Sequence, residues 1–599
     1  MSGVASTAAG APSSGELAHR PATRHKRWVL GSLWLAAPGL AFLAVFFLLP
    51  VLRLISLSAF DADTGAVTSA HYARIYGTSI YFRVLLTTFE IAGGTAALSV
   101  LLGYPLAWWL ARQPDRRQGW LILLVMLPFW TSYLVKAFAW MVVLGREGPL
   151  NRMLLGSGLA NAPVQWLHEL AGTMIGMVHA MLPLAVLTML PVMNALDRRL
   201  SQAAGALGAS PAQAFWRIDF PATLPGVTAA GLLTFISSLG FFIVPALLGG
   251  RRQTMLAQLI ITQVQEMLNW GFAGALAALM VTAALITCWF YNRLFGLSSL
   301  QGEASGTRTG SDTALRRLGL GVVAGVARVA DLAAGLSEAA TGGRIARFLL
   351  PSVAWTVLTF LILPTLVVIP MGFTSSSFIT FPPPGFSLRW FQEYFGSPIW
   401  IAATVRSFGV AFATAFAATL LGGLAALALA RSRSRWRGAV FTLFLAPMIV
   451  PRIVLAVGLF YLFAQLGLVA TDLGLVIGHT VLALPFVVVT LAAVLKGYDW
   501  RLDQAAAVLG AGRLRILALI TAPLLRGGLI AAFLFAFITS LDELSVAIFV
   551  SGGSKTTLPK QMWDDMVMQI NPTLAAVSVV VLAVVTSLLV LAERLRRSA

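Results

Sequence analysis

Long apolar runs, separated by short polar or charged segments, recur from residue 30 almost to the C-terminal end of the chain. A helix needs about 20 apolar residues to cross the hydrocarbon core of a bilayer. Backbone polar groups in lipid must be satisfied within the segment, so continuous runs predict helices rather than the alternating strands of a β-barrel. Twelve segments qualify: 30–52, 85–110, 120–144, 172–196, 225–249, 271–295, 348–371, 402–430, 438–465, 471–495, 527–550 and 573–593. The pattern predicts an all-α polytopic membrane protein of about twelve transmembrane helices.

Composition supports this interpretation and removes several classes of function. Of the 599 residues, 58% are hydrophobic and 11% charged, whereas soluble domains carry about 25% charged residues. A soluble enzyme, a DNA-binding protein and a disulfide scaffold are therefore excluded as the main interpretation. The net charge of +19 indicates basic cytoplasmic loops rather than a nucleic-acid partner, so membrane lipid is the expected surrounding. The single cysteine, Cys288, excludes disulfides and thiolate metal clusters.

Arginines concentrate in alternate loops, which predicts the orientation of the chain. Because Lys and Arg collect on the cytoplasmic side, these loops are expected inside and both termini are expected to be cytoplasmic. The Ser/Ala/Gly/Pro-rich segment 1–27 is predicted to be a disordered cytoplasmic tail before an uncleaved first helix. The arginines in question are Arg112, Arg116, Arg117, Arg198, Arg199, Arg217, Arg431, Arg433, Arg435 and Arg437.

The chain repeats itself at a shift of 302 residues. Gln202-Ala203-Ala204 aligns with Gln504-Ala505-Ala506, and Leu207-Gly208-Ala209 aligns with Leu509-Gly510-Ala511. Six spans, an even number, separate the two copies, so both copies lie on the same face and the duplication is parallel rather than inverted. The predicted halves are residues 28–296 and 346–599. They are joined by a cytoplasmic linker, 297–345, that is interpreted as a fusion joint with a short interfacial helix near 313–340.

The repeated block predicts a short helix lying along the cytoplasmic surface. Asp197 and Asp499 are suited to cap its start, and Gly208 and Gly510 to end it or bend it sharply. Small alanines let another backbone approach, as in a helix that docks into a groove on a partner. An ordinary re-entry loop is the plain alternative, but two copies at one fixed shift favour docking.

Gln202–Gly226 and Gln504–Gly528 resemble the cytoplasmic EAA loop of ABC importer permeases, with Gln in place of the leading Glu in both copies. The resemblance implies that Gln202–Ala209 and Gln504–Ala511 form coupling helices, each seated in a cleft of an ATP-binding subunit. Two ATP-binding cassette subunits are then the expected partners. They would bind ATP and Mg, and this chain itself would hold no cofactor and carry out no catalysis.

A narrower resemblance concerns permeases of the spermidine/putrescine type. Leu127–Leu134 and Pro245–Gly250 resemble one permease subunit of that system, and Ser540–Val546 resembles the other. This implies two permease subunits fused in one inner-membrane chain, with a small cationic solute delivered by a periplasmic or extracellular solute-binding protein. Gly240-Phe241-Phe242 departs from the family, which often has an acidic residue there. An opine, an organophosphonate or ferric ion therefore stay open as substrates.

Four side chains in the spans are candidates for the substrate pathway. Asp542 and Glu543, in the second half of the eleventh span, carry carboxylates suited to an ammonium group, or alternatively to a structural contact with a neighbouring basic residue. On one helix they would point about 100° apart, so one at a time would face the pathway. Trp130 and Tyr133, three apart on one helical face, suit cation–π contact with an amine or simple packing.

The competing class is an ion-coupled secondary transporter, which also commonly uses twelve helices in two halves. It predicts carboxylates in proton relays and no repeated docking helix, so the repeat disfavours it. A membrane-bound enzyme is also disfavoured, because the sequence shows no nucleophile or metal constellation. Gly552–Thr556 does not match the phosphate-binding pattern G-x-x-x-x-G-K-[ST]. The energy for transport is therefore expected to come from a partner or from an ion gradient.

Overall fold

The computed structural model describes residues 33–61, 64–295, 344–553, 555–568 and 571–597, together with residue 325. The predicted tail 1–27 and nearly all of the predicted linker 297–345 lie outside the described residues. Within these ranges the regular structure is helical, and β-pairing is limited to isolated bridges such as that between Phe60 and Val67. The predicted all-α class is confirmed.

Among the described residues, eight helical segments are long and apolar enough to cross a membrane, and three bent helix pairs raise the number to eleven. The twelfth predicted span corresponds to the shorter apolar stretch Thr573–Leu588 of α29 (Thr573–Arg597). The first span consists of α2 (Ala37–Leu43) and α3 (Leu49–Leu57), joined through a π-helical turn. The other seven are α5 (Ser79–Leu110), α9 (Leu170–Asn194), α12 (Phe220–Leu239) with the turn before it, α15 (Trp270–Phe295), α17 (Arg344–Gly372), α19 (Pro398–Arg431) and α22 (Asp472–Lys496).

Several predicted spans are broken rather than continuous. The segment 120–144 divides into α6 (Asp115–Trp130) and α7 (Tyr133–Leu144), and α6 is bent by 92° from the stretch Tyr133–Gly156 that α7 begins. Likewise, 438–465 divides into α20 (Arg437–Ile449) and α21 (Arg452–Leu466), bent by 94°. Pro451 explains the second bend, since a proline disfavours helical backbone in the residue before it and Val450 is extended. In the first pair α6 continues through Pro128 to Trp130, and the break falls at the extended residues Thr131 and Ser132.

The fifth span of each half also breaks. The segment 225–249 becomes α12 followed by α13 (Ile243–Leu248), and 527–550 becomes α26 (Arg526–Leu541) followed by α27 (Ser545–Val550). After α13 and after α27 a short loop leads to one more helix, α14 (Leu256–Gln265) in the first half and α28 (Leu558–Met568) in the second. The smaller surface helices are α4 (Ala70–Gly77), α8 (Pro149–Gly156), α10 (Arg198–Ala206), α11 (Pro211–Ala214), α18 (Arg389–Gly396), α23 (Arg501–Val508), α24 (Arg513–Ile516) and α25 (Ala522–Leu524).

The duplication holds at the level of individual hydrogen bonds. The His168 N–H donates to the Leu248 carbonyl at 2.7 Å, and 302 residues later the Ala470 N–H donates to the Val550 carbonyl at the same distance. A hydroxyl on the second span of each half caps the start of α14 or α28. Thr88 Oγ1 accepts from the Leu256 N–H at 2.8 Å, and Ser407 Oγ accepts from the Leu558 N–H at 2.7 Å.

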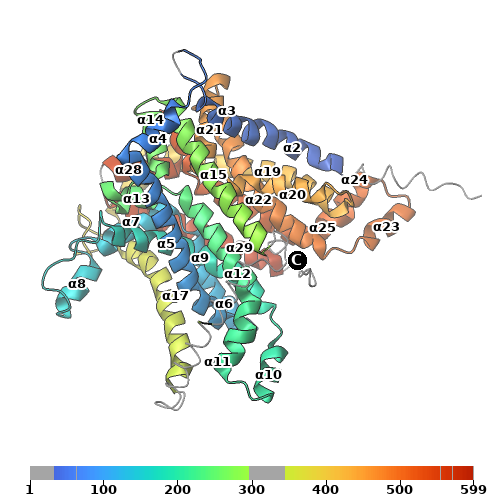
Figure 1. The fold of residues 1–599 in the computed structure, drawn as a ribbon, viewed down its shortest axis with the longest axis horizontal. Helices are drawn as coiled ribbons and strands as arrows, with labels where there is room; N and C mark the ends of the chain where they lie inside the picture. Colours follow the sequence, from blue (N-terminus) through green and yellow to red (C-terminus); the bar gives the residue numbers. More distant parts are fainter. Residues whose placement is uncertain are drawn as a thin grey trace, which may run out of the picture.

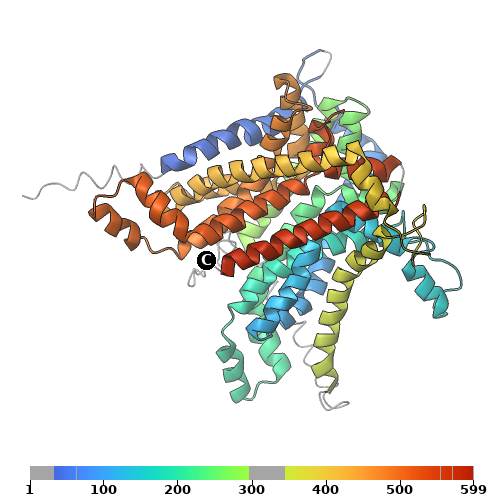
Figure 2. The same cartoon turned by 180° about the vertical axis from the view of Figure 1, so that it is seen from behind.

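The molecule has two lobes that meet at one end and diverge toward α10–α11 and α23–α24 at the other (Figure 1, Figure 2). One apolar cluster fills the lobe made of α5, α6, α9, α12 and α17, and a second fills the lobe made of α19, α22, α26 and α29. The largest cluster joins residues of both halves where the lobes converge. The first span of each half packs on the opposite half: α17 lies against α5, α6 and α7, and residues 33–43 lie against α19.

Candidate coupling loops and the charged cluster between the halves

The repeated block forms the two short surface helices that the sequence predicts, α10 and α23. The Asp197 side chain accepts from the Arg199 N–H at 3.0 Å, and the Asp499 side chain accepts from the Arg501 N–H at 3.0 Å. Each aspartate thereby satisfies an N–H at the start of its helix that has no partner within the helix. The predicted cap is confirmed for Asp197, whereas Asp499 lies one residue before the N-cap position, Trp500, and bonds the first N–H of α23 from there.

Each helix ends two residues before its glycine, which forms the turn that follows. Gly208 and Gly510 have φ of 89° and 85°, the left-handed region in which residues other than glycine are strained. The N–H of the following alanine, Ala209 or Ala511, then bonds back at 3.0 Å to the carbonyl of Ala204 or Ala506. This is the Schellman arrangement, and it turns the chain back toward the membrane-spanning part.

The tips of both loops are exposed and apolar. Leu207 is 90% exposed and Leu509 is 88% exposed, on the ends of separate lobes (Figure 1). Within the repeated motif the side chains divide between outside and inside. Gln202, Ala203, Gln504 and Ala505 are exposed, Ala204 is half-buried and Ala506 is buried. Each loop therefore offers an apolar tip beside amide side chains, with its inner alanine packed on its own lobe.

The break after α26 changes the interpretation of Asp542 and Glu543. These two residues lie between α26 and α27, not on a helix, so the expected spacing of about 100° between helical neighbours does not apply. Asp542 is half-buried and accepts hydrogen bonds from the Ser132 side chain and the Tyr133 N–H of the other half. The charges of Lys136 and Arg452 also lie near it.

Glu543 is 2% exposed and caps the short helix that follows it. Its Oε2 accepts from the N–H groups of Val546 and Ala547 at 2.9 and 3.3 Å, and His479 Nε2 lies 3.5 Å away. Of the two carboxylates, Glu543 is thus held by α27, while Asp542 faces the other half.

The position equivalent to Asp542 in the first half is Gly240, and the structure shows why it has no side chain. A Cβ on Gly240 would lie 2.8 Å from Pro451 Cβ and 3.2 Å from its Cα. Each break in a fifth span therefore packs on the helix bend of the opposite half. Only the second-half break has room for a carboxylate, so the cluster between the halves is asymmetric.

Trp130 and Tyr133 do not share one helical face, because α6 ends at Trp130 and Ser132 caps the start of α7. Trp130 packs on Phe535 with ring centroids 4.8 Å apart. Tyr133 contacts Phe241 at 4.9 Å, and the Lys136 ammonium lies 4.2 Å from the Tyr133 ring centroid. The expected cation–π contact of Tyr133 thus already exists with a cation of this chain.

A small cavity brings part of this set together. Trp130 and Ser132 from the first half face Leu541, Asp542, Met562 and Val585 from the second. Sequence reasoning named Trp130 and Asp542 but not Ser132 or Arg452. Pro128 and Pro451 were the available signal, since a proline within an apolar run marks a helix bend and an ordered break beside it.

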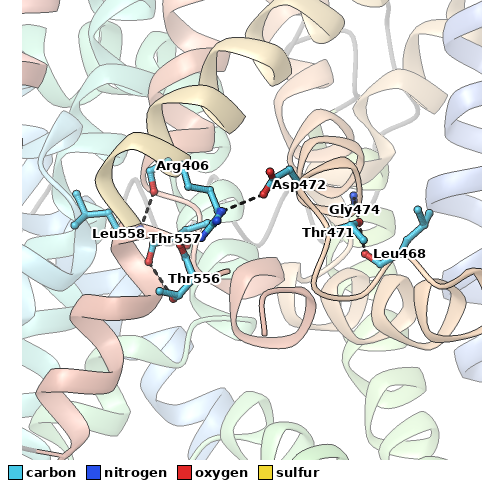
Figure 3. Close-up of polar contacts among 9 residues, drawn as sticks. Arg406, Leu468, Thr471, Asp472, Gly474, Thr556, Thr557 and Leu558 are labelled. Atoms are coloured by element: carbon cyan, nitrogen blue, oxygen red, sulfur yellow. Dashed lines mark hydrogen bonds and ion pairs between the residues drawn. The ribbon is translucent and has the colours of Figure 1, made fainter. Parts of the chain in front are cut away.

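At the end where the lobes meet, the second half has a polar connection of its own (Figure 3). Arg406 of α19 donates to Asp472 Oδ1 at 3.1 Å and to the Thr556 carbonyl at 3.3 Å. The Ser407 hydroxyl, also on α19, accepts from the Leu558 N–H at the start of α28. The segment between α27 and α28 is therefore bound to α19, which is itself bound to α22 through Asp472. In the second spans, where Thr88 corresponds to Ser407, Arg406 corresponds to Thr87, and at the shift of 302 residues Asp472 corresponds to Leu170. Neither first-half residue carries a charge, so this connection is asymmetric as well.

Both halves match one family model, the inner membrane component of binding-protein-dependent transport systems, over residues 103–294 and 418–599. The chain belongs to this family. It is a multi-pass inner-membrane protein that carries two copies of the family's domain.

The relatives match separate halves of the chain. It is 32% identical over 260 residues to the spermidine/putrescine transport system permease protein PotB of Escherichia coli K12, covering 42% of this chain and 94% of that protein. It is 32% identical over 250 residues to the corresponding permease protein PotC of Haemophilus influenzae, covering 42% of this chain and 97% of that protein. The resemblance to two fused permease subunits of this type is confirmed. A solved bacterial alginate ABC transporter matches 47% of this chain at 17% identity, with a TM-score of 0.39.

Proposed function

We propose that this chain is the complete translocation unit of an ATP-driven importer. Two ATP-binding cassette subunits would dock on α10 and α23, and a solute-binding protein would deliver the substrate at the opposite end. The observation that carries the proposal is the pair of exposed leucines, Leu207 and Leu509, at equivalent positions on separate lobes. An exposed apolar side chain beside small residues suits a groove on a partner protein.

The α10/α23 end would face the cytoplasm, and both termini would lie on that side. The arginines that predict this orientation lie in the loop of α10 and at or after the ends of α5 and α19. The lobes diverge toward this end and meet at the other (Figure 2). The conformation corresponds to access from the cytoplasm, and closure of the two ATPases would draw the loops together and open the opposite end.

The substrate would be a small cation of the putrescine or spermidine kind. Two relatives are permease proteins of spermidine/putrescine systems, and Asp542 offers a half-buried carboxylate between the halves. A carboxylate within membrane-spanning structure is costly and by default serves a function. With Glu543 engaged in capping α27, Asp542 is the group proposed to receive an ammonium.

A second substrate class has its own support. Lys136 and Arg452 place two positive charges near Asp542, and the first half has no acidic counterpart at Gly240. This balance suits an amine that also carries an acid group, such as an opine, better than a long polyamine with several ammonium groups. Direct competition between these classes decides the substrate.

The test is uptake of labelled putrescine by cells expressing the chain with the ATPase and binding-protein genes that accompany it. Unlabelled spermidine, an opine, an organophosphonate and ferric ion serve as competitors, and Asp542→Asn is the matched variant. Competition by amines and a raised KM in Asp542→Asn support the proposal. Competition by the opine alone selects the second class, and uptake that is indifferent to Asp542 removes this carboxylate from the pathway.

A further inference from the structure

Each short surface helix is tied to two membrane-spanning helices by an arginine, a carboxylate and a hydroxyl. In the first half the arginine is Arg112, directly after α5, the carboxylate is Asp219, in the turn that enters α12, and the hydroxyl is Ser201, on α10. Arg112 Nη2 lies 3.6 Å from Asp219 Oδ2. Ser201 Oγ donates a hydrogen bond to Asp219 Oδ1.

The second half has the same three groups in a different order. Arg431 ends α19, the carboxylate is Asp503 on α23, and the hydroxyl is Thr521, in the turn that enters α25. Arg431 Nη2 lies 2.5 Å from Asp503 Oδ2, and Thr521 Oγ1 donates to Asp503 Oδ1 at 3.1 Å. The Tyr498 hydroxyl donates to the same oxygen at 2.6 Å.

The shift that relates the two halves shows that the carboxylate and the hydroxyl have exchanged places. At 302 residues, Ser201 aligns with Asp503 and Asp219 aligns with Thr521. The arginines correspond through the second spans, where Leu110-Ala111-Arg112 aligns with Leu429-Ala430-Arg431. Both halves therefore have one carboxylate hydrogen-bonded to one hydroxyl, although the residue type differs between the halves at each of these two positions.

Burial explains why the groups must stay together. The Asp219 and Asp503 side chains are only 14% and 12% exposed, so either carboxylate without its arginine would be a poorly solvated charge. Each arginine is also held by an aromatic ring: the Arg112 guanidinium lies 3.3 Å from the Trp108 ring centroid and that of Arg431 lies 5.0 Å from the Trp500 ring centroid. Burial lowers the pKa of Arg112, and Asp219 counteracts this.

We propose that this group, defined as Arg112, Asp219 and Ser201 in the first half and Arg431, Asp503 and Thr521 in the second, is a clamp. It makes each coupling helix move as one body with the end of the second span and the start of the fifth. The clamp needs one carboxylate and one hydroxyl in each half. The carboxylate can lie on the surface helix and the hydroxyl in the turn before the fifth span, or the reverse. Its role in transport rests on the proposed function, whereas its effect on the helix does not.

The test transplants one arrangement into the other half. Asp219→Thr removes the carboxylate, and Ser201→Asp with Asp219→Thr installs the second-half order in the first half. ATP-driven uptake measures transport, and hydrogen exchange of residues 198–209 in the purified full chain measures the anchoring of α10. Asp219→Thr is expected to lower uptake and speed exchange by about tenfold, as for loss of a charge-assisted hydrogen bond. The double variant is expected to restore both to within about twofold of the wild type.

The mirror variants, Asp503→Ser alone and Asp503→Ser with Thr521→Asp, repeat the test in the second half. If Asp219→Thr does not accumulate in the membrane, Asp219→Asn takes its place, because it keeps the size of the side chain without the charge. The clamp is overturned if the single variants exchange and transport as the wild type does, or if folded double variants are no better than the single ones. A wild type without ATP-driven uptake overturns the proposed function instead, and hydrogen exchange still decides whether the clamp exists.

Discussion

Replacing Leu207 and Leu509 by serine separates docking from folding. These leucines are 90% and 88% exposed, so their replacement is expected to leave the thermal unfolding of the chain unchanged. If each side chain becomes buried in an ATPase groove, it contributes about 2 kcal/mol to docking. For an ATPase dimer that engages both loops at once the two contributions add to about 4 kcal/mol, which corresponds to a dissociation constant roughly a thousandfold higher in the double variant, whereas a single ATPase subunit on one loop would lose about thirtyfold.

The assay is a titration of the purified ATPase onto the chain in lipid nanodiscs, with each single variant and the double variant measured beside the wild type. Leu159→Ser is the matched control, because Leu159 is 77% exposed but follows α8, away from α10 and α23. It should bind the ATPase as the wild type does. A double variant that keeps wild-type affinity while its unfolding midpoint is unchanged would refute the assignment of these loops as docking sites.

Three further predictions follow from the packing. Ala at Gly176 would place Cβ 2.4 Å from a Leu248 methyl, so Gly176→Ala should lower the unfolding midpoint by the equivalent of about 1–3 kcal/mol. Gly93→Ala, where nothing lies within 4 Å, should not, and equal midpoints would contradict the packing. Gly208→Ala should cost about 1 kcal/mol in local helix stability because of its positive φ. Faster hydrogen exchange at Ala209 would show this, with Gly205→Ala as the control that should slow it. Lys136→Met removes a positive charge near Asp542 and should lower the KM for putrescine uptake, whereas a raised KM would mean that Lys136 only supports the fold.

The sequence was sufficient for what depends on length and local chemistry. Apolar runs predicted the spans, the fixed shift predicted the duplication, and Asp197 and Gly208 predicted where α10 begins and ends. These features depend on residues close together in the chain, so a local rule reaches them.

The breaks and the cluster between the halves were beyond that reasoning. Trp130 and Tyr133 were placed on one helix because apolar content alone does not show a bend, although Pro128 marked it. Asp542 meets Ser132 and Tyr133 across the two halves, more than 400 residues apart in the sequence. Contacts of this kind depend on how the lobes pack, and no local pattern contains that information.

The asymmetry between the halves has a physical origin that only the packing reveals. Gly240 lies against Pro451 with no space for a side chain, whereas the equivalent Asp542 faces Ser132 and a cavity. The duplication therefore supplies two similar surface loops, proposed here as coupling loops, but a single carboxylate at the position proposed for the pathway. This fits a translocation unit in which both halves move and one of them presents the proposed substrate contact.

Transport by reconstituted vesicles tests the central claim most directly. The chain, its ATPases and its binding protein would be placed in proteoliposomes, and labelled putrescine uptake would be compared under internal ATP and under a proton or sodium gradient. The account predicts uptake that requires ATP, the ATPases and the binding protein together, with none from a gradient alone. Uptake by the chain alone, driven only by an ion gradient, would contradict it and make Asp542 and Glu543 candidates for an ion relay.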